Sequence, residues 1–311
     1  MKQGLKITYI RYLAAKKYVD DRALNGHVWQ TLKTNLPSSC SQEKLEVIEF
    51  GAGTGTMFER AISWGLSPHL HYTMVEINPE YLAAFTSPPF QNRHSSSHTL
   101  EWRSSTSADI RSTDVDGTVD IVCADLNDVI SNQKYHRRWD LIMAHAVMDL
   151  VKIDDVLTGF EQLVKPGGLL YLSLNYDGLT SFLPPFDSAF EHHLFERYHH
   201  SMDQRTTNGR PAGSSRSGRE LFSQLSKRHL SILAAGSSDW IVYPTVRGYL
   251  DNDAYFLQTI LQTIHQELQR DNQLDPHRLD AWVARRQAQI NATELIFMAR
   301  NIDFLVKVPA D

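Results

Sequence analysis

The chain has little cysteine and no long hydrophobic run. Its 311 residues include two cysteines, Cys40 and Cys123, too few for a disulfide framework, and Cys123 lies in an apolar stretch where we expect a buried thiol. No run of about 18 uncharged apolar residues occurs, so we expect no membrane-spanning helix. The N-terminal Met-Lys-Gln-Gly-Leu-Lys lacks the apolar core of a signal peptide, and we expect a cytoplasmic protein without a membrane partner.

A surplus of basic residues is also missing. Lys and Arg number 31 against 36 Asp and Glu, which gives a formal net charge of −5. Because nucleic-acid binders concentrate basic side chains to neutralise phosphates, we expect no nucleic-acid partner. The hydrophobic fraction of 42% is ordinary for a globular protein, and the length suffices for one large α/β domain.

Short apolar runs alternate with helical periodicity over residues 45–174. The expected strands are 47–50, 72–77, 119–126, 140–146 and 169–174. The expected helices between them are 56–65, 79–86, 127–131 and 151–164. Continuous apolar strands that alternate with helices indicate a parallel sheet covered on both faces, which is a doubly wound α/β fold.

The flanking regions are less regular. Residues 8–36 have helical spacing, 87–118 form a polar insertion with a short strand near 100–102, and 177–217 are expected to be irregular. Beyond them we expect helices at 218–228, 254–269 and 278–292, and strands at 230–236, 239–243 and 295–308. We therefore divide the chain into an N-terminal helical extension, 1–40, and a Rossmann-like domain, 41–311, with lid segments 177–219 and 244–293.

The strongest local signal is a glycine loop after the first apolar strand. Gly51, Gly53 and Gly55 follow the strand directly and a helix begins after them. Glycines allow a sharp turn and close approach to a ligand, and the helix N-terminus offers free N–H groups. Glu76 ends the next strand, where a carboxylate can accept hydrogen bonds from a ribose diol. The pattern favours a nucleoside site over a plain strand–helix turn.

A dinucleotide site is the main alternative. Its fingerprint is G-x-G-x-x-G, and Thr56 stands where the third glycine is required. The acidic Glu49 immediately before the loop suits a ligand with a cationic amine better than a pyrophosphate.

At these residues the chain resembles the class I S-adenosylmethionine-dependent methyltransferases. The resemblance rests on five segments in the family's order, namely Glu-Phe-Gly-Ala-Gly-Thr-Gly (49–55), Val-Glu-Ile-Asn-Pro (75–79), Val-Cys-Ala-Asp-Leu (122–126), Trp-Asp-Leu-Ile-Met-Ala-His (139–145) and Leu-Val-Lys-Pro-Gly-Gly (163–168). It implies a mostly parallel seven-stranded sheet with an antiparallel last strand, N-terminal helices and an inserted helical lid. It also implies S-adenosyl-L-methionine as cofactor.

The resemblance assigns the cofactor to named positions. They are Glu49, Gly51, Ala52, Gly53, Gly55, Glu76, Ile77, Asp125, Leu126, Ala144 and His145. Glu76 would bind the ribose hydroxyls, and Asp125 with Leu126 would border the adenine. For Asp125 the other reading is a cap of the following helix, since Asp favours helix starts.

Catalytic and acceptor residues leave a weaker trace. His145 is the candidate base, because it ends the fourth strand and has a suitable intrinsic pKa, although lining of the cofactor pocket is favoured over catalysis. The acceptor-binding candidates are Asp149, Tyr176, Tyr198, His199, Arg205, Arg216 and Arg219. The arginines match an anionic acceptor with a carboxylate or phosphate, or else face water, and both readings stay open. Adjacent histidines at 192–193 and 199–200 lack a completing ligand set, so no metal is expected.

We thus expect a methyltransferase that acts on a small molecule, with the acceptor atom (O, N or C) and the oligomeric state left open. A non-catalytic binding module of the same fold is the alternative, and a nicotinamide-dependent oxidoreductase is less favoured. Trp240, Trp282 and Tyr255 are read as core residues first and as walls of an acceptor pocket second. Arg22 is read as a helix-face charge first and as a partner of the cofactor carboxylate second.

Overall fold

The computed structural model describes residues 9–37, 43–87, 98–207 and 210–310. The helices are α1 (Tyr9–Ala23), α2 (Gly26–Asn35), α3 (Thr56–Ser63), α4 (Pro79–Thr86), α6 (Leu126–Ser131), η1 (Gln133–Tyr135), η2 (Met148–Leu150), α7 (Ile153–Leu163), α8 (Ser188–Asp203), α9 (Ser217–Lys227), α10 (Asp253–Leu268) and α11 (Pro276–Asn291). The strands are β1 (Leu45–Phe50), β2 (His69–Glu76), β3 (His98–Ser104), β4 (Ser107–Ser112), β5 (Asp116–Cys123), β6 (Trp139–His145), β7 (Val164–Leu183), β8 (Thr206–Thr207), β9 (Arg210–Pro211), β10 (Ser231–Ser237), β11 (Trp240–Val242) and β12 (Ile296–Lys307). None of these helices is both long and apolar enough to cross a bilayer.

A single large sheet organises the chain. Its strand order is β10-β12-β7-β6-β1-β2-β5-β4-β3, and β11 pairs with β12. Strands β5, β2, β1, β6 and β7 run parallel, whereas β12 lies antiparallel between β7 and β10. The expected α/β class, the mostly parallel sheet and the antiparallel last strand are therefore confirmed.

The sheet has ten strands where seven are expected. Part of the excess is the β3–β4 hairpin, which extends the edge beyond β5 in the region expected to be an irregular insertion. The side chains of β3 alternate between half-buried and exposed positions, whereas Ala108 and Ile110 of β4 are buried. The ion pairs Arg103–Asp109 and Arg111–Glu101 lie along the hairpin. The short strand expected near 100–102 falls within β3, but the hairpin has few apolar side chains, so the rest of it gives little sequence signal.

Helices cover both faces of the parallel strands. Val47 of β1 packs with α2, α3 and α4 in one buried cluster, while Ile48 and Phe50 pack with α6, α7 and α9 in another. This alternation follows from the period of two along a strand. The carboxyl ends of the parallel strands, where ligands of such sheets bind, remain free of these layers.

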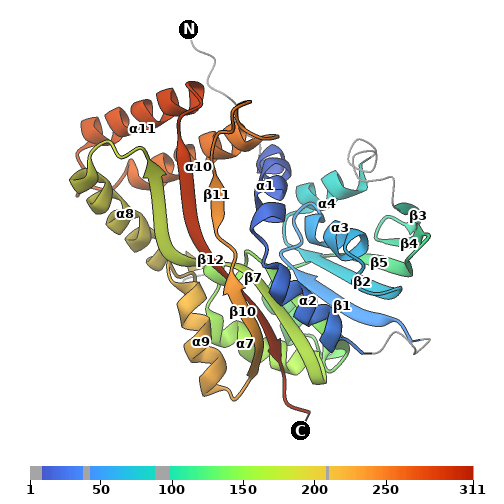
Figure 1. The fold of residues 1–311 in the computed structure, drawn as a ribbon. Helices are drawn as coiled ribbons and strands as arrows, with labels where there is room; N and C mark the ends of the chain where they lie inside the picture. Colours follow the sequence, from blue (N-terminus) through green and yellow to red (C-terminus); the bar gives the residue numbers. More distant parts are fainter. Residues whose placement is uncertain (1–8, 38–42, 88–97, 208–209, 311) are drawn as a thin grey trace.

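A second helical layer packs on an arm formed by the end of β7, the start of β12 and β11. β7 continues to Leu183 and stays paired with the start of β12, so both strands rise beyond the sheet edge (Figure 1). Helices α8, α10 and α11 share a third buried cluster with this arm. The expectation of an irregular segment at 177–217 is wrong, because residues up to Leu183 are strand and 188–203 are helix. The domain boundaries themselves stay a prediction.

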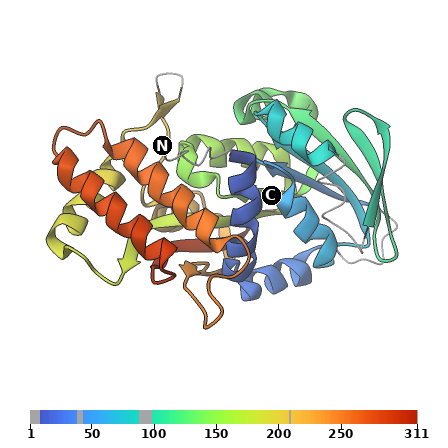
Figure 2. The same ribbon diagram turned by 90° about the horizontal axis from the view of Figure 1, so that it is seen from above.

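The N-terminal region forms two helices, with Asn25 between them. The Asn25 side chain accepts a hydrogen bond from Val28 N (3.1 Å) and so caps α2, and its backbone N–H donates to Asp303 Oδ2 (2.8 Å). α1 packs against α10 and β11, and Figure 2 shows it at the centre of the molecule beside α10. The expected burial of Cys123 is wrong, since this thiol is exposed at the end of β5. Cys40 lies outside the described residues.

One buried ion pair fixes the helical layer. Arg286 is fully buried, pairs with Glu191 and donates to Pro184 O (2.7 Å), while Trp282 Nε1 donates to Glu191 Oε1 (2.8 Å). We expect Arg286→Met to lower the free energy of unfolding by about 3–5 kcal/mol, because it leaves a buried carboxylate without its counter-ion. Urea denaturation measures this change. The double change Glu191→Gln, Arg286→Met should recover part of the loss, and a loss below about 1 kcal/mol, as for exposed pairs, contradicts the role.

Candidate functional site

The three glycines of the loop have different reasons to be glycine. All have positive φ, namely 68° at Gly51, 55° at Gly53 and 80° at Gly55. A Cβ on Gly51 would lie 2.6 Å from Val147 Cγ2, and one on Gly55 would lie 2.5 Å from the Phe85 ring. A Cβ on Gly53 would meet nothing closer than a leucine methyl at 3.5 Å. Packing therefore requires glycine at positions 51 and 55, whereas the space at Gly53 would admit a Cβ.

Glu76 is held against this loop from the end of β2. Its Oε2 accepts a hydrogen bond from Gly53 N (2.8 Å) and its Oε1 accepts one from Asn78 N (2.9 Å). The residue is buried, but each carboxylate oxygen keeps a lone pair for a further donor. The carboxylate therefore has a fixed orientation before any ligand binds.

A cavity of about 350 Å³, here called the loop cavity, opens beside these residues. Its walls include nine of the expected cofactor positions, namely Glu49, Gly51, Ala52, Gly53, Glu76, Ile77, Asp125, Leu126 and His145. Gly55 and Ala144 do not line it, since Gly55 packs on Phe85 and Ala144 is fully buried among core residues. Asp125 also caps α6 by accepting from Asn127 N (2.8 Å), so the capping reading of this residue is correct.

Helix α1 contributes lining residues that were not among the expected site residues, although packing of residues 17–25 across the cofactor site was one of the two readings considered from the sequence. Tyr9, Leu13, Lys16 and Asp20 line the loop cavity from this helix. They recur at intervals of four, three and four residues, which is one helical stripe. The helical spacing over residues 8–36 predicts Asp20 and Asp21 on a polar side of the helix, and this prediction is wrong for Asp20, which is 2% exposed. The available sequence signal was that Lys16 and Asp20 fall at helical spacing from the apolar Leu13.

Asp20 is the centre of a buried polar network. It accepts hydrogen bonds from Lys16 Nζ (2.7 Å) and Trp240 Nε1 (3.0 Å), and its Oδ2 lies 3.1 Å from His145 Nε2. Burial raises the pKa of this carboxyl, but Lys16, His145 and Arg60 outweigh burial and hold the pKa well below its usual range. Asp20 is therefore ionised and joins α1 to β6 and β11.

Both ring nitrogens of His145 are occupied. Nε2 lies 3.1 Å from Asp20 Oδ2, which can only accept, and 3.4 Å from Arg60 Nη1, which can only donate. Because the contact with Asp20 is the shorter, this nitrogen carries the proton, and Nδ1 accepts from the Ser173 hydroxyl (2.9 Å). Burial lowers the pKa of His145 to about 4. This geometry favours a wall of the cavity over a base that takes a proton from an acceptor.

Glu49 lies 1% exposed beneath the loop, and Tyr72 donates to it (2.8 Å). Burial raises the pKa of Glu49 to about 7, and Tyr72 and Arg60 offset this only in part. Arg60 is itself buried and donates to Asp21 Oδ1 (2.6 Å). The Glu49 carboxyl, which lines the loop cavity, therefore loses its proton near neutral pH.

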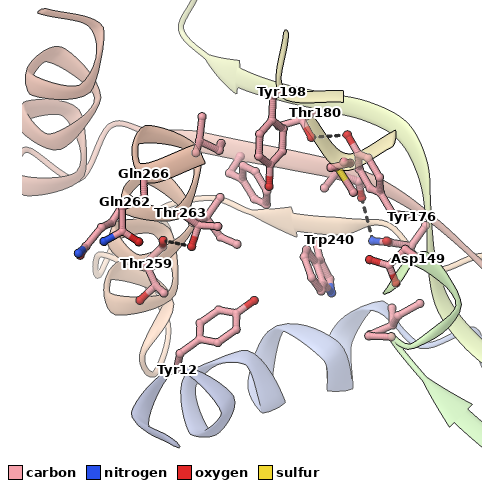
Figure 3. Close-up of a pocket in the computed structure, with 18 of the residues that line it drawn as sticks. Tyr12, Asp149, Tyr176, Thr180, Tyr198, Trp240, Thr259, Gln262, Thr263 and Gln266 are labelled. Atoms are coloured by element: carbon pink, nitrogen blue, oxygen red, sulfur yellow. Dashed lines mark hydrogen bonds between the residues drawn. The ribbon is translucent and has the colours of Figure 1, made fainter. Parts of the chain in front are cut away.

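A second cavity of about 400 Å³ adjoins the first, and we call it the tyrosine cavity. Tyr9 and Ala146 line both. Figure 3 shows Tyr12, Asp149, Tyr198 and Trp240 around its interior, with the Tyr12 and Tyr198 hydroxyls directed inward. Ala146 has a φ of 56°, a strained value for a residue with a Cβ, at the point between the two cavities.

Four of the expected acceptor residues line the tyrosine cavity, namely Asp149, Tyr176, Tyr198 and Arg205. His199 stands behind them and contacts the Tyr176 hydroxyl through Nε2 (2.8 Å). Arg216 and Arg219 are exposed outside the cavity, and Arg219 pairs with Asp177 (2.8 Å). The spacing of four residues would place His145 and Asp149 on one helical face if a helix began at His145. No such helix forms in this described segment, because β6 ends at His145 and Asp149 belongs to η2.

The remaining aromatic and charged candidates divide clearly. Trp240 lines the tyrosine cavity, whereas Trp282 and Tyr255 belong to the buried helical layer. Arg22 pairs with Asp253 (2.7 Å), which ties α1 to α10 and gives neither of the two roles considered from the sequence.

Known proteins resemble this chain in fold. Among solved structures, phosphoethanolamine N-methyltransferase 2 of Haemonchus contortus, solved with S-adenosyl-L-methionine, shares 11% identity over 98% of this chain, with a TM-score of 0.43. This chain spans only 60% of that enzyme. A methyltransferase of Methanosarcina mazei shares 12% identity over 87% of this chain and 95% of its own, with a TM-score of 0.45. A putative type II methyltransferase of Anaeromyxobacter dehalogenans shares 14% over 93% and 98%, with a TM-score of 0.45.

No family model matches the chain, and no curated protein matches its sequence. At these identities and TM-scores the structural likeness says nothing of substrate or activity. A functional assignment therefore rests on the strand order and the two cavities.

The buried Glu49 makes stability depend on pH. The unfolded carboxyl ionises near its ordinary pKa of 4.5, whereas the folded one keeps its proton to about 7. Glu49 therefore lowers stability progressively as pH rises through this window, by about 3 kcal/mol in total. Glu49→Gln should remove this fall, so the stability difference between variant and wild type should grow from pH 4.5 to 7 and then level off. Urea denaturation across pH measures it, and parallel curves would contradict the pKa shift.

Proposed function

We propose that this chain is an S-adenosyl-L-methionine-dependent methyltransferase with a small-molecule acceptor. The observation that carries the proposal is the pair of adjoining cavities at the carboxyl edge of the sheet. One is bordered by the glycine loop and Glu76, the other by aromatic and polar side chains, and Ala146 lies between them. Transfer between two bound molecules requires two sites that meet in this way.

The residues of the loop cavity fit the proposed cofactor. Glu76 keeps lone pairs for the ribose hydroxyls, and the open side of Gly53 leaves room for a chain that passes the loop. Asp125 and Leu126 border the same cavity from the end of β5, where an adenine amine finds an acceptor. Glu49 and Lys16 lie at the other end, near the expected amine and carboxylate of the methionine part.

The bound cofactor would supply an activated methyl sulfonium, so the protein has to align an acceptor and exclude water. Alignment of this kind contributes up to about 7–11 kcal/mol to lowering a barrier. α1 covers the loop cavity with Tyr9 and Leu13, and the tyrosine cavity with Tyr9 and Tyr12. The network around Asp20 fixes this helix in place.

Two observations favour this function over its alternatives. The antiparallel β12 between β7 and β10, together with Thr56 in place of glycine, weighs against a nicotinamide dinucleotide. A module that only binds the cofactor has no use for a second cavity of about 400 Å³ beside the first. We therefore infer an enzyme.

Gly53 provides the sharpest test of the cofactor site. We expect Gly53→Val to weaken S-adenosylmethionine and S-adenosylhomocysteine binding about a hundredfold or more, which is ~3 kcal/mol, because the side chain fills the loop cavity. Isothermal titration calorimetry measures both affinities.

Gly65→Val is the matched control. Gly65 also has a positive φ (62°) and open space around its Cβ position, but it lies outside both cavities. This variant carries the same backbone strain and should keep wild-type affinity. Equal affinity of the Gly53 variant and wild type would reject the site, and absence of binding by wild type at millimolar cofactor would reject the function.

A further inference from the structure

One carboxylate oxygen in the tyrosine cavity has no hydrogen-bond partner among the residues that the structure describes. This oxygen, Asp149 Oδ1, is buried. An unpaired buried polar atom destabilises the folded chain, and more so when it is charged. Asp149 belongs to η2, three residues after Ala146, so it stands close to the junction with the loop cavity. A binding partner from outside the chain would remove this cost.

The surroundings of Asp149 suit a cation. Figure 3 shows its carboxylate near the indole of Trp240, with the Tyr12 and Tyr198 hydroxyls directed into the same space. Lys16 Nζ lies 5.2 Å from the centroid of the Trp240 ring, so this ring already contacts one cation. Tyrosine hydroxyls can accept hydrogen bonds from an ammonium group. Burial raises the pKa of Tyr198 to about 12, so this hydroxyl stays neutral. Burial likewise raises the pKa of Asp149, and its own backbone N–H, Arg205 and Lys16 offset this only in part.

Arg205 lines the same cavity and favours the opposite ligand charge. It is partly exposed, so water can solvate its guanidinium without a ligand. The Asp149 oxygen has neither water access nor a protein partner. The Asp149 carboxylate therefore gains more from a ligand of opposite charge than the solvated Arg205 guanidinium does. At this point the cavity favours an ammonium over the anionic acceptor considered from the sequence.

We propose that the tyrosine cavity binds its acceptor through a basic amine, with Asp149 as the counter-ion. This inference rests on the proposed function and names its substrate class. The ammonium N–H donates to the Asp149 carboxylate, and transfer of that proton to the carboxylate leaves the nitrogen with a free lone pair. A nitrogen in that state is what a methyl acceptor requires.

Three probes of one shape and different charge test the proposal, namely benzylamine, benzyl alcohol and benzoate. Calorimetry on the full chain without cofactor compares them in wild type, in Asp149→Asn and in Asp114→Asn, an exposed carboxylate outside both cavities. We expect wild type to bind benzylamine about tenfold more tightly than the alcohol, which is 1.4 kcal/mol. Asp149→Asn should lose this preference, and Asp114→Asn should keep it.

Several results would overturn the inference. Equal binding of the three probes would overturn it, and so would no binding of benzylamine up to about 10 mM. Tightest binding of benzoate would also overturn it, because it would assign recognition to Arg205. Cofactor affinity measured separately distinguishes the two levels. Cofactor binding without amine preference leaves the proposed function and removes the inference. Amine preference without cofactor binding rejects the proposed function and leaves an amine-binding site that is not a methyl-acceptor site.

The thermal stability of the Asp149→Asn variant gives an independent readout. Since Oδ1 has no hydrogen bond to lose, the variant should unfold at the same temperature as wild type or higher. A lower unfolding temperature would mean that the carboxylate serves the fold, and it would count against the proposal.

Discussion

The buried carboxylate of Asp20 holds the site together. It binds Lys16 on its own helix, Trp240 on β11 and His145 at the end of β6, so one group connects three elements. Among the residues that the structure describes, Tyr9 of α1 and Ala146 are the two that line both cavities. If this network were absent, α1 would rest on its contacts with α10 and β11 alone, and both cavities would lose a side.

Charge balance differs among three buried or half-buried carboxylates that line the two cavities. Asp20 has three partners that more than offset burial, and its low pKa keeps it ionised. Glu49 and Asp149 are only partly offset, and burial raises the pKa of both. Each of these two faces a cavity, one beside the glycine loop and the other among tyrosines. Incompletely compensated buried charge is typical of positions where a ligand completes the site.

The strands and helices with a clear hydrophobic pattern were predicted from the sequence. The strands around Val47 and Leu141 are continuous apolar runs, and the glycine loop with Glu76 marks one cavity. The arm beyond Tyr176 was missed because its strands bury side chains only against α8 and α10, a local pattern without a regular period. Asp149 and Arg205 were predicted from the sequence as acceptor residues, and both line the tyrosine cavity. Arg216 and Arg219 were predicted with them but lie outside this cavity, because their positions depend on tertiary packing. The buried role of Asp20 needed knowledge of what α1 packs against.

The central claim is that the loop cavity is a cradle for a sulfonium nucleoside. A crystal structure of the protein grown with S-adenosylhomocysteine tests it most directly. The account predicts ribose hydroxyls on the Glu76 carboxylate, the amino-acid end beside Gly53, and the sulfur directed toward Ala146 and the tyrosine cavity. An empty loop cavity at saturating ligand, or the nucleoside bound elsewhere on the chain, would contradict it.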